Sequence, residues 1–235
     1  MRYAWIIFNA AIWTSLFGLF GIVASIFESN KGKTLGYCAR LWGKYILFFT
    51  GVRFSVKGLD NLDSKGTYIF ACNHASGYDV PLAFAGLPYW LISIAKIELK
   101  SVFILGWVMK TAGHIFVDRK RSENAIASLE KSKKSLIKNP RSILLFPEGT
   151  RTMDGKLGLF KRGGLMLSLD TGIPIVPVGI VGTFEMLKKG TWSFKNQPLE
   201  IRIGNPIDPK IFSNDSKNSL AKYVKTQVHT LLDQN

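Results

Sequence analysis

The sequence predicts an α/β fold: a single domain with a mixed, largely parallel sheet flanked by helices, preceded by an N-terminal membrane-embedded helical segment. Two observations lead to this prediction. From residue 66 onward, short apolar runs alternate with helix-like stretches, which is typical of layered α/β folds. Before them lies an uncharged run of membrane length. We therefore expect a membrane-anchoring helical segment over residues 1–52 and one domain over residues 53–235.

The N-terminal run extends from Tyr3 to Phe27 without a charged residue, whereas a helix that spans a bilayer needs about 20 residues. It is longer than the apolar region of a secretory signal peptide and is followed by Glu28-Ser29-Asn30, so we expect it to stay attached. A second apolar stretch, Tyr45–Val52, is too short to span but suits the membrane interface. A single span and a hairpin that dips into one leaflet both fit this pattern. The third interpretation is a buried core helix of a soluble protein.

The charge balance indicates an anionic partner. The 235 residues include 31 Lys and Arg against 16 Asp and Glu, a formal net charge of +15, and 47% are hydrophobic, which excludes a disordered chain. More cations follow the apolar run than precede it, so the positive-inside rule predicts a domain on the cytoplasmic face of the membrane. These cations are Lys31, Lys33 and Arg40 against Arg2. Cys38 and Cys72 form neither a disulfide framework nor a zinc motif, so we expect a reducing compartment and no metal.

Six apolar runs are predicted as strands: Tyr68–Cys72, Leu91–Ala95, Ile115–Val117, Ile143–Phe146, Ile175–Val178 and Leu199–Ile203. Helices are predicted at Val80–Ala85, Lys100–Ala112, Glu123–Lys138, Leu159–Asp170 and Leu220–Leu232. The stretch from Arg119 to Arg141 carries eight basic residues, which form either a solvated helix face or a surface for anionic headgroups. No aromatic residue interrupts these cations, so the stacking platform of nucleic-acid binders is missing, and no nucleic acid is expected.

Polar residues follow the first predicted strand in the order Asn73-His74-Ala75-Ser76-Gly77-Tyr78-Asp79. Open α/β sheets usually bind ligands at the carboxyl ends of their strands. The spacing of His74 and Asp79 allows the loop to fold back and bring the carboxylate to the imidazole. Asp79 would then fix the tautomer, and the other ring nitrogen could take a proton from a substrate hydroxyl. Cys72 is an alternative nucleophile, although a small core residue is the more ordinary role of a cysteine in an apolar strand.

Two further strands end in residues that suit an anionic ligand. Phe146-Pro147-Glu148-Gly149-Thr150-Arg151 offers a carboxylate, a flexible glycine, a hydroxyl and a guanidinium, which together suit phosphate and hydroxyl groups. Gly113-His114-Ile115-Phe116-Val117-Asp118-Arg119 ends in another arginine, and Lys96 follows the strand Leu91–Ala95. Lys96, Arg119 and Arg151 could therefore converge on one anion. Neither a P-loop nor a G-x-S-x-G motif occurs, so direct attack by a bound alcohol is the expected chemistry.

Together these clusters resemble the glycerolipid acyltransferases with the H-x-x-x-x-D box, specifically the 1-acyl-sn-glycerol-3-phosphate (lysophosphatidate) acyltransferases. The resemblance covers about residues 55–207 and comprises four blocks in the family's order. The first three are the clusters that contain His74, Arg119 and Arg151, and the fourth is Ile173-Pro174-Ile175-Val176-Pro177-Val178. The family also carries a membrane-embedded N-terminal helical portion.

The resemblance implies transfer of a fatty acyl group from an acyl thioester, either acyl-CoA or acyl carrier protein, to the sn-2 hydroxyl of lysophosphatidic acid. The product would be phosphatidic acid, made in phospholipid biosynthesis. The implied catalytic residues are His74, the general base, and Asp79, which orients it. The implied substrate-binding residues are Lys96, Arg119, Glu148, Gly149, Thr150 and Arg151, with Lys96 and Arg151 expected to contact phosphate directly. No metal or other cofactor is expected, and the expected partners are an anionic phospholipid membrane, lysophosphatidic acid and the thioester donor.

Two alternatives stay open at this point. The first is an acyltransferase that acts on another lysophospholipid or lipid alcohol. The second is a non-catalytic membrane-surface protein that binds acidic lipids through its basic face, with no dependence on His74. Because exposed charges are screened by salt, lipid binding of this second kind would be lost as the salt concentration rises.

Overall fold

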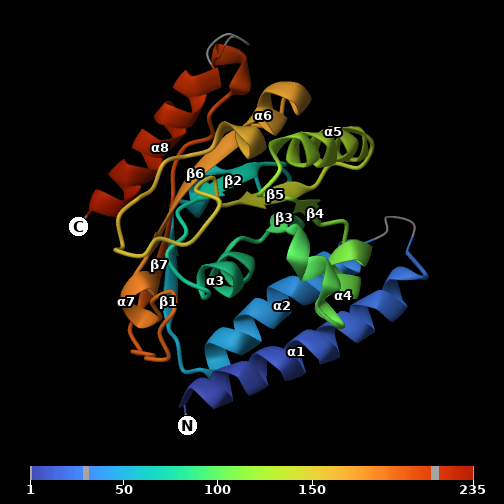
Figure 1. Cartoon of the computed structure of the whole chain (residues 1–235), viewed down its shortest axis with the longest axis vertical. Helices are drawn as coiled ribbons and strands as arrows, with labels where there is room; N and C mark the ends of the chain where they lie inside the picture. Colours follow the sequence, from blue (N-terminus) through green and yellow to red (C-terminus); the bar gives the residue numbers. More distant parts are fainter. Residues whose placement is uncertain (1, 29–31, 213–216, 235) are drawn as a thin grey trace.

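A seven-stranded sheet lies between two layers of helices (Figure 1). The computed structural model describes residues 2–28, 32–212 and 217–234. The strands are β1 (Phe54–Lys57), β2 (Ile69–Cys72), β3 (Leu91–Lys96), β4 (Ile115–Val117), β5 (Ser142–Leu145), β6 (Ile175–Val181) and β7 (Leu199–Ile203). Their order is β1-β7-β6-β2-β5-β3-β4, and every neighbouring pair is parallel except β6 and β7. The predicted mixed, largely parallel sheet is confirmed.

The α-helices of the described residues are α1 (Arg2–Ser25), α2 (Lys33–Phe49), α3 (Asp79–Gly86), α4 (Leu105–Thr111), α5 (Ser122–Lys138), α6 (Arg162–Thr171), α7 (Thr183–Met186) and α8 (Lys217–Asp233). Short 3-10 helices occur at η1 (Leu59–Asn61), η2 (Ile97–Ser101) and η3 (Pro209–Ile211). Helices α1, α2 and α3 lie on one side of the sheet, and α5, α6 and α8 lie on the other (Figure 1).

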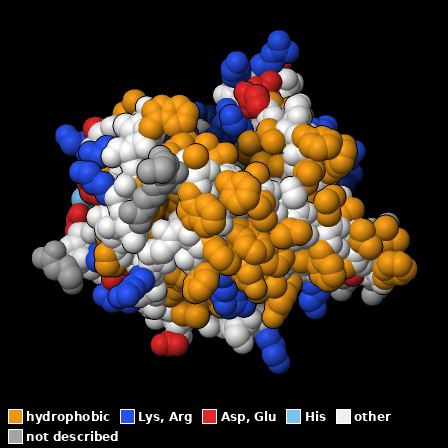
Figure 2. Space-filling view, turned by 90° about the horizontal axis from the view of Figure 1, so that it is seen from below, with side chains coloured by type: hydrophobic (Ala, Val, Ile, Leu, Met, Phe, Trp, Pro, Cys, Tyr) orange, Lys and Arg blue, Asp and Glu red, His pale blue; other side chains and the backbone are white. Residues whose placement is uncertain are grey.

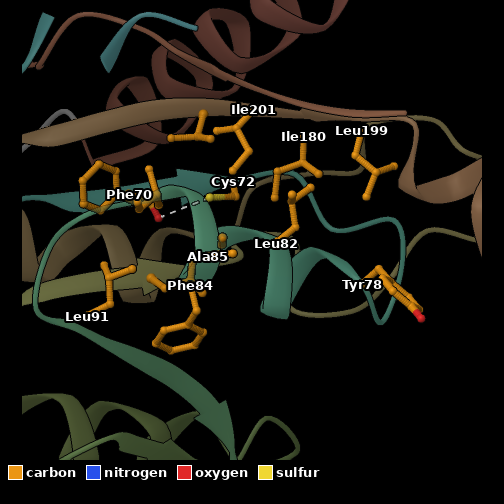
Figure 3. Packing of buried hydrophobic residues seen from close by; sticks show 14 of the residues in the cluster. Phe70, Cys72, Tyr78, Leu82, Phe84, Ala85, Leu91, Ile180, Leu199 and Ile201 are labelled. Carbon is orange, nitrogen blue, oxygen red and sulfur yellow. Dashed lines mark hydrogen bonds between the residues drawn. The ribbon is translucent and has the colours of Figure 1, made fainter. Parts of the chain in front are cut away.

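Strand β2 is the centre of the core. It lies between β5 and β6, and all four of its residues are buried because helices cover both faces of the sheet. Side chains alternate along a strand, so Phe70 and Cys72 face the layer of α3 while the other two face the opposite layer. Figure 3 shows Phe70 and Cys72 packed among Leu82 of α3, Ile180 of β6 and Ile201 of β7. The first candidate loop therefore starts from the buried centre of the sheet.

The structure differs from the sequence-based prediction in several places, and the four-residue helix α7 is one that has no predicted counterpart. Strand β1 has no predicted counterpart, because alternation over only four residues is too short a signal. The predicted helix Lys100–Ala112 starts only at Leu105, since Ile104 has a φ of 60°, which a helix does not accommodate. The predicted helix Leu159–Asp170 starts only at Arg162, because the preceding residue is hydrogen-bonded to the loop after β5.

Helices α1 and α2 pack against each other as an antiparallel hairpin (Figure 1). The indole Nε1 of Trp42 donates to Oγ1 of Thr14 at 3.0 Å, and that of Trp5 donates to the carbonyl of Phe49 at 2.9 Å. Helix α2 packs in turn on α3, where Gly43 lies against the α3 backbone. The hairpin is thus attached to the domain along its length. Lys31, one of the cations used to predict orientation, lies outside the described residues, as do Ser29 and Asn30.

Helix α1 is long and apolar enough over Tyr3–Ser25 to cross a membrane, and only 22% of its most apolar window is buried. This low burial argues against a buried core helix. Large apolar side chains are exposed on the hairpin, on α4 and on the residues just before α4. Figure 2 shows apolar side chains gathered on one face of the molecule. The exposed side chains include Phe8, Phe20, Phe48, Phe103 and Trp107. We call these five residues, with the helices that carry them, the apolar face.

The basic helix α5 lies on the side of the sheet opposite α1 (Figure 1). Its Leu129 and Leu136 pack toward the core, whereas Lys133 pairs with Asp170 of α6 at 3.4 Å. Lys131, Lys134 and Lys138 are exposed on α5, as either of the two roles considered for this stretch requires.

We predict that Gly43→Ala destabilises the protein. A Cβ at Gly43 would lie 2.4 Å from the carbonyl oxygen of Pro81 and 2.9 Å from the amide nitrogen of Ala85, and backbone atoms of α3 cannot yield without displacing the helix. The expected loss is about 1–3 kcal/mol. Thermal unfolding followed by circular dichroism in detergent measures it. Gly163→Ala is the matched control: its nearest neighbour, Leu129, is 3.9 Å away, so that variant should be at least as stable as wild type. Equal unfolding midpoints for the two variants would contradict this account.

Candidate active site

The loops that follow four parallel strands meet at one edge of the sheet. Strand β5 lies between β2 and β3, and β4 lies beside β3. The loops after β2 and β5, which carry the first and third sequence clusters, are therefore neighbours. The loops after β3 and β4 carry Lys96 and Arg119 and lie on the side of β5 away from β2. This sheet order brings residues from four separate stretches of sequence to one place.

The structure brings His74 and Asp79 together. Nδ1 of His74 lies 2.8 Å from Oδ2 of Asp79, and the same oxygen accepts hydrogen bonds from the amides of Ala75 at 2.7 Å and Ser76 at 2.8 Å. Asp79 has no exposed surface and forms the first residue of α3, where the helix dipole favours negative charge. Three donors on one oxygen hold the carboxylate, and with it the imidazole, in one orientation.

The imidazole of His74 is held on its flat side as well. Its ring stacks on Phe146, with centroids 4.1 Å apart and planes 21° from parallel. The neighbouring Asn73 fixes the start of the loop, because its side chain donates to the carbonyl of Ile180 at 2.9 Å and accepts from the amide of Ile180 at 2.7 Å. With Nδ1 turned to Asp79, Nε2 is the nitrogen left for a substrate, and His74 lines a cavity. The arrangement suits a general base that accepts a proton at Nε2.

Glu148 joins the loop of His74 to the loop after β5. Its Oε1 accepts from the amide of His74 at 2.6 Å, and its Oε2 accepts from the amide of Gly158 at 2.8 Å. The amide of Thr152 also donates to the carbonyl of His74, at 2.9 Å. Burial raises the pKa of Glu148, and the hydrogen bonds from the two amides oppose this shift. Because both of its oxygens are engaged and it does not line the cavity, the geometry gives Glu148 a positioning role.

A cavity of about 580 Å³ opens at His74. The expected ligand-binding residues that line it are Lys96, Arg119, Thr150 and Arg151. Gly149 does not line it and acts through its carbonyl, which accepts a hydrogen bond from Nη1 of Arg119 at 2.6 Å. Arg151 lies over the loop of His74, since a Cβ on Gly77 would be 3.6 Å from its Nη1. The expected residues thus divide into those that face the cavity and those that support them.

One cavity-lining cation, Lys189, is missing from the sequence analysis. Its Nζ donates to Oγ1 of Thr150 at 3.0 Å and lies 3.4 Å from the carbonyl oxygen of Arg151. It comes from the loop after α7, which is fastened to the His74 loop by a 2.8 Å hydrogen bond from Oγ of Ser76 to the carbonyl of Leu187. No motif marks Lys189, and the Lys188-Lys189 pair after an apolar strand was the only available signal. None of the cavity-lining cations pairs with a carboxylate of the described residues within 4.0 Å.

The rest of the cavity wall is apolar and comes from α1, α2, α3 and α4. Its residues include Phe17, Leu35, Trp42, Val80, Phe84 and Met109. Lys96, Arg119 and Thr150 are exposed at the surface, so the cavity has a charged entrance and an apolar interior. Such a division suits a ligand with an anionic head and a hydrocarbon tail.

Besides the His74–Asp79 pair, thiol and imidazole side chains of this region include Cys38, Cys72 and His114, and the buried Cys38 lines the cavity on α2. Cys72 is completely buried, and burial raises the pKa of its thiol well above the usual range, so it does not supply a nucleophile. His114 lines the cavity elsewhere, where its Nδ1 accepts a hydrogen bond from the amide of Ser93 at 2.9 Å. The geometry therefore leaves direct attack by a bound alcohol as the chemistry that this site suits.

A histidine held by a buried carboxylate lies where a cationic entrance meets an apolar cavity, an arrangement that suits acid–base chemistry on an amphipathic ligand. The sequence comparisons identify the family. Residues 53–181 match the family described as Acyltransferase. The chain belongs to the acyltransferase family.

Several relatives bear the name 1-acyl-sn-glycerol-3-phosphate acyltransferase. The protein of Saccharomyces cerevisiae is 32% identical over 216 residues, which cover 90% of this chain and 71% of that protein. The human alpha form is 29% identical, with 82% of this chain and 68% of that protein covered. The coconut (Cocos nucifera) protein is 28% identical, and this chain spans 62% of its length. Part of that last relative therefore lies outside the matched region.

A solved structure agrees with the whole fold. The crystal structure of the 1-acyl-sn-glycerophosphate (LPA) acyltransferase PlsC from Thermotoga maritima superposes with a TM-score of 0.82 at 27% identity. The superposition covers 100% of this chain and 96% of that one. The likeness therefore includes the α1–α2 hairpin as well as the sheet.

Proposed function

We propose that this protein transfers a fatty acyl group from an acyl thioester to the sn-2 hydroxyl of lysophosphatidic acid, giving phosphatidic acid. The observation that carries the proposal is the position of Nε2 of His74, between a cluster of unpaired cations and an apolar cavity. An acceptor with a phosphate at one end and an acyl chain at the other would be held at both ends, with its hydroxyl near the base. The names of the relatives support the same acceptor.

In the proposed reaction, Nε2 of His74 takes the proton of the acceptor hydroxyl while the hydroxyl oxygen attacks the thioester carbonyl carbon. A carbon–oxygen bond forms, and the carbonyl electron pair moves to its oxygen. Collapse of this intermediate breaks the carbon–sulfur bond, and the leaving thiolate takes the proton from the imidazolium. Asp79 stabilises that imidazolium through Nδ1. The products are an ester and a free thiol, and no metal or redox cofactor is needed because the thioester supplies the activation.

The cations supply the binding energy for the anionic parts of the substrates. Lys96, Arg151 and Lys189 would bind the acceptor phosphate, and Arg119 would be placed for it by the carbonyl of Gly149. Among the described residues, the hydrogen-bond partners of the Arg119 and Lys189 side chains are neutral oxygens, so these two cations keep their charge for a ligand. The thioester is either acyl-CoA or acyl carrier protein, and both bring an acyl chain to the apolar interior. Holding two substrates in line in this way is itself a large part of catalysis.

We infer that the apolar face lies in a phospholipid membrane with the domain on the cytoplasmic side. Helix α1 packs along α2 and the domain rather than projecting from them, which favours a hairpin immersed in one leaflet over a single span. Phe103 and Trp107, near and on α4, are exposed large apolar side chains outside the hairpin. A lipid acceptor could then reach the cavity from the leaflet, since α1, α2 and α4 form both the apolar face and part of the cavity wall.

We predict that His74→Ala lowers turnover by about 100-fold or more, because the general base is removed. Purified protein in detergent, supplied with oleoyl-CoA or oleoyl-acyl carrier protein and lysophosphatidic acid, is assayed for phosphatidic acid by mass spectrometry. His229→Ala is the matched control: His229 pairs with Asp233 at 2.6 Å on the surface of α8 and should be dispensable. Full activity of His74→Ala would overturn the mechanism. Product only with a lysophospholipid of another head group would reassign the acceptor, and no product with any acceptor would favour the non-catalytic alternative.

We predict that Lys189→Gln raises the KM for lysophosphatidic acid about tenfold, because one charge-assisted contact to phosphate is lost. The KM for monoacylglycerol, which lacks the phosphate, should stay unchanged if that acceptor is used. Lys188→Gln serves as the control, since Lys188 pairs with Glu185 at 3.6 Å and lies over the ring of Phe184. Identical acceptor kinetics for the two variants would remove Lys189 from the site.

We predict that the protein stays bound to phospholipid vesicles in high salt, because burial of apolar side chains is not screened by ions. Vesicle flotation measures the bound fraction. The double variant Phe103→Ser, Trp107→Ser should bind more weakly than wild type, whereas substitution of exposed Ile126 on α5 by serine should have no effect. Release of the wild type by salt alone would instead support adsorption through the basic residues.

A further inference from the structure

A polar pair lies within the apolar interior of the cavity. Ser93, in the middle of β3, and His114, directly before β4, both line it and are not used by the proposed reaction. Apolar side chains lie beside them, since Phe84 has its ring centroid 6.2 Å from that of His114 and Met109 also lines this region, while the buried guanidinium of Arg141 lies nearby. Hydrogen-bonding groups in such a place need partners.

The hydrogen bonds of His114 define which nitrogen carries its proton. The backbone amide of Ser93 donates to Nδ1 of His114 at 2.9 Å, and Oγ of Ser93 lies 2.7 Å from the same nitrogen. A backbone amide can only donate, so Nδ1 must be the acceptor, and the neutral ring carries its hydrogen on Nε2. Burial, aided by the nearby charge of Arg141, lowers the pKa of His114 to about 4, so the ring is neutral at pH 7.

The Nε2 hydrogen is a donor without an acceptor. No residue within 2–28, 32–212 or 217–234 accepts a hydrogen bond from it. Because Nδ1 faces Ser93, the opposite edge of the ring is the part that remains for the cavity. A saturated acyl chain beside this nitrogen would leave the donor unpaired, whereas a chain that carries an oxygen at this level would supply the acceptor.

The strand register gives the depth of the pair. Ser93 is aligned with Leu144, and Leu144 with Phe70, which precedes His74 by four residues. Two of these four steps lie within β2 and two in the loop that follows Cys72; at about 3.3 Å per residue of extended backbone, they place the pair about 13 Å from His74. An extended chain advances about 1.2 Å per bond, which places the pair roughly ten to twelve bonds from the reacting carbonyl group.

We propose that Nε2 of His114 donates a hydrogen bond to a hydroxyl or keto oxygen in the middle of an acyl chain, while Ser93 holds the ring through Nδ1. The protein would then prefer acyl groups oxygenated near carbon 12 over unsubstituted ones of the same length. This inference rests on the proposed acyl transfer and adds a substrate class to it. The oxygenated chain could belong to the thioester donor or to the acceptor, because the chemistry that recognises it is the same.

Competition assays with the full-length protein test the inference. In the donor arm, 12-hydroxystearoyl-CoA competes with stearoyl-CoA for 1-oleoyl lysophosphatidic acid. In the acceptor arm, lysophosphatidic acid carrying a 12-hydroxystearoyl chain competes with the stearoyl form for oleoyl-CoA. One arm should show a preference in kcat/KM of about five- to tenfold for the hydroxylated chain, which is the effect of one neutral hydrogen bond. A 3-hydroxystearoyl chain, whose oxygen lies far from His114, should show no preference in that arm.

A variant assigns the preference to the imidazole. His114→Phe keeps an aromatic ring and removes both nitrogens, so the ratio for 12-hydroxystearoyl over stearoyl should fall to about one. Met109→Leu, an apolar exchange in the same region, should leave the ratio unchanged. If His114→Phe does not fold, the dependence on hydroxyl position in the wild type decides by itself.

Three results would overturn the inference. They are equal use of hydroxylated and plain chains in both arms, equal preference for the 3- and 12-hydroxy chains, and a preference that survives in a folded His114→Phe variant. Turnover of stearoyl-CoA with 1-oleoyl lysophosphatidic acid, measured alongside, separates these outcomes from a failure of the proposed function. Without that turnover both proposals fail, whereas with it only the chain preference is in question.

Discussion

The buried carboxylate of Asp79 is the group on which the rest of the site depends. One of its oxygens receives the imidazole of His74 and two backbone amides of the intervening loop, so a single interaction both closes the loop and orients the base. Burying a carboxylate is costly unless donors replace its water, and here the folded loop supplies three donors to Oδ2, whereas Oδ1 has no hydrogen-bond partner among the described residues. Asp79 also begins α3, whose Leu82 packs against β2. The site geometry is thereby coupled to the core.

The insertion of β5 between β2 and β3 explains how distant residues meet. Arg119 reaches across to the carbonyl of Gly149, and Lys189 reaches the hydroxyl of Thr150, so neighbouring loops fix the cations with neutral oxygens. A carboxylate partner would hold a cation equally well but would cancel its charge. A neutral partner holds the cation in place and leaves the electrostatic potential of the cavity entrance positive. The two buried carboxylates also differ in their partners. Asp79 accepts from the imidazole of His74, whereas the oxygens of Glu148 accept from the backbone amides of His74 and Gly158.

Structural features that depend on a few neighbouring residues could be predicted from the sequence. The six predicted strands are regular apolar runs, and the distance from His74 to Asp79 is a property of one loop. The role of Glu148 was not predictable, because a glutamate in a turn can face a ligand or an amide, and only the position of Gly158 decides. Lys189 has no motif and enters the site through the packing of its loop on Ser76. Strand β1 is stabilised by pairing with β7, about 140 residues later, which no short window can reveal.

The hairpin of α1 and α2 supplies cavity wall as well as apolar surface, and it does so through close contacts. Gly18 meets Val108 of α4, Gly36 meets Trp90, and Gly43 meets the backbone of α3, each at a distance that leaves no room for a methyl group. A tether that merely localises an enzyme can be exchanged by recombination for any other tether. This one cannot, because its replacement would remove one side of the substrate chamber. A substitution in the hairpin therefore alters the apolar surface and the cavity wall together.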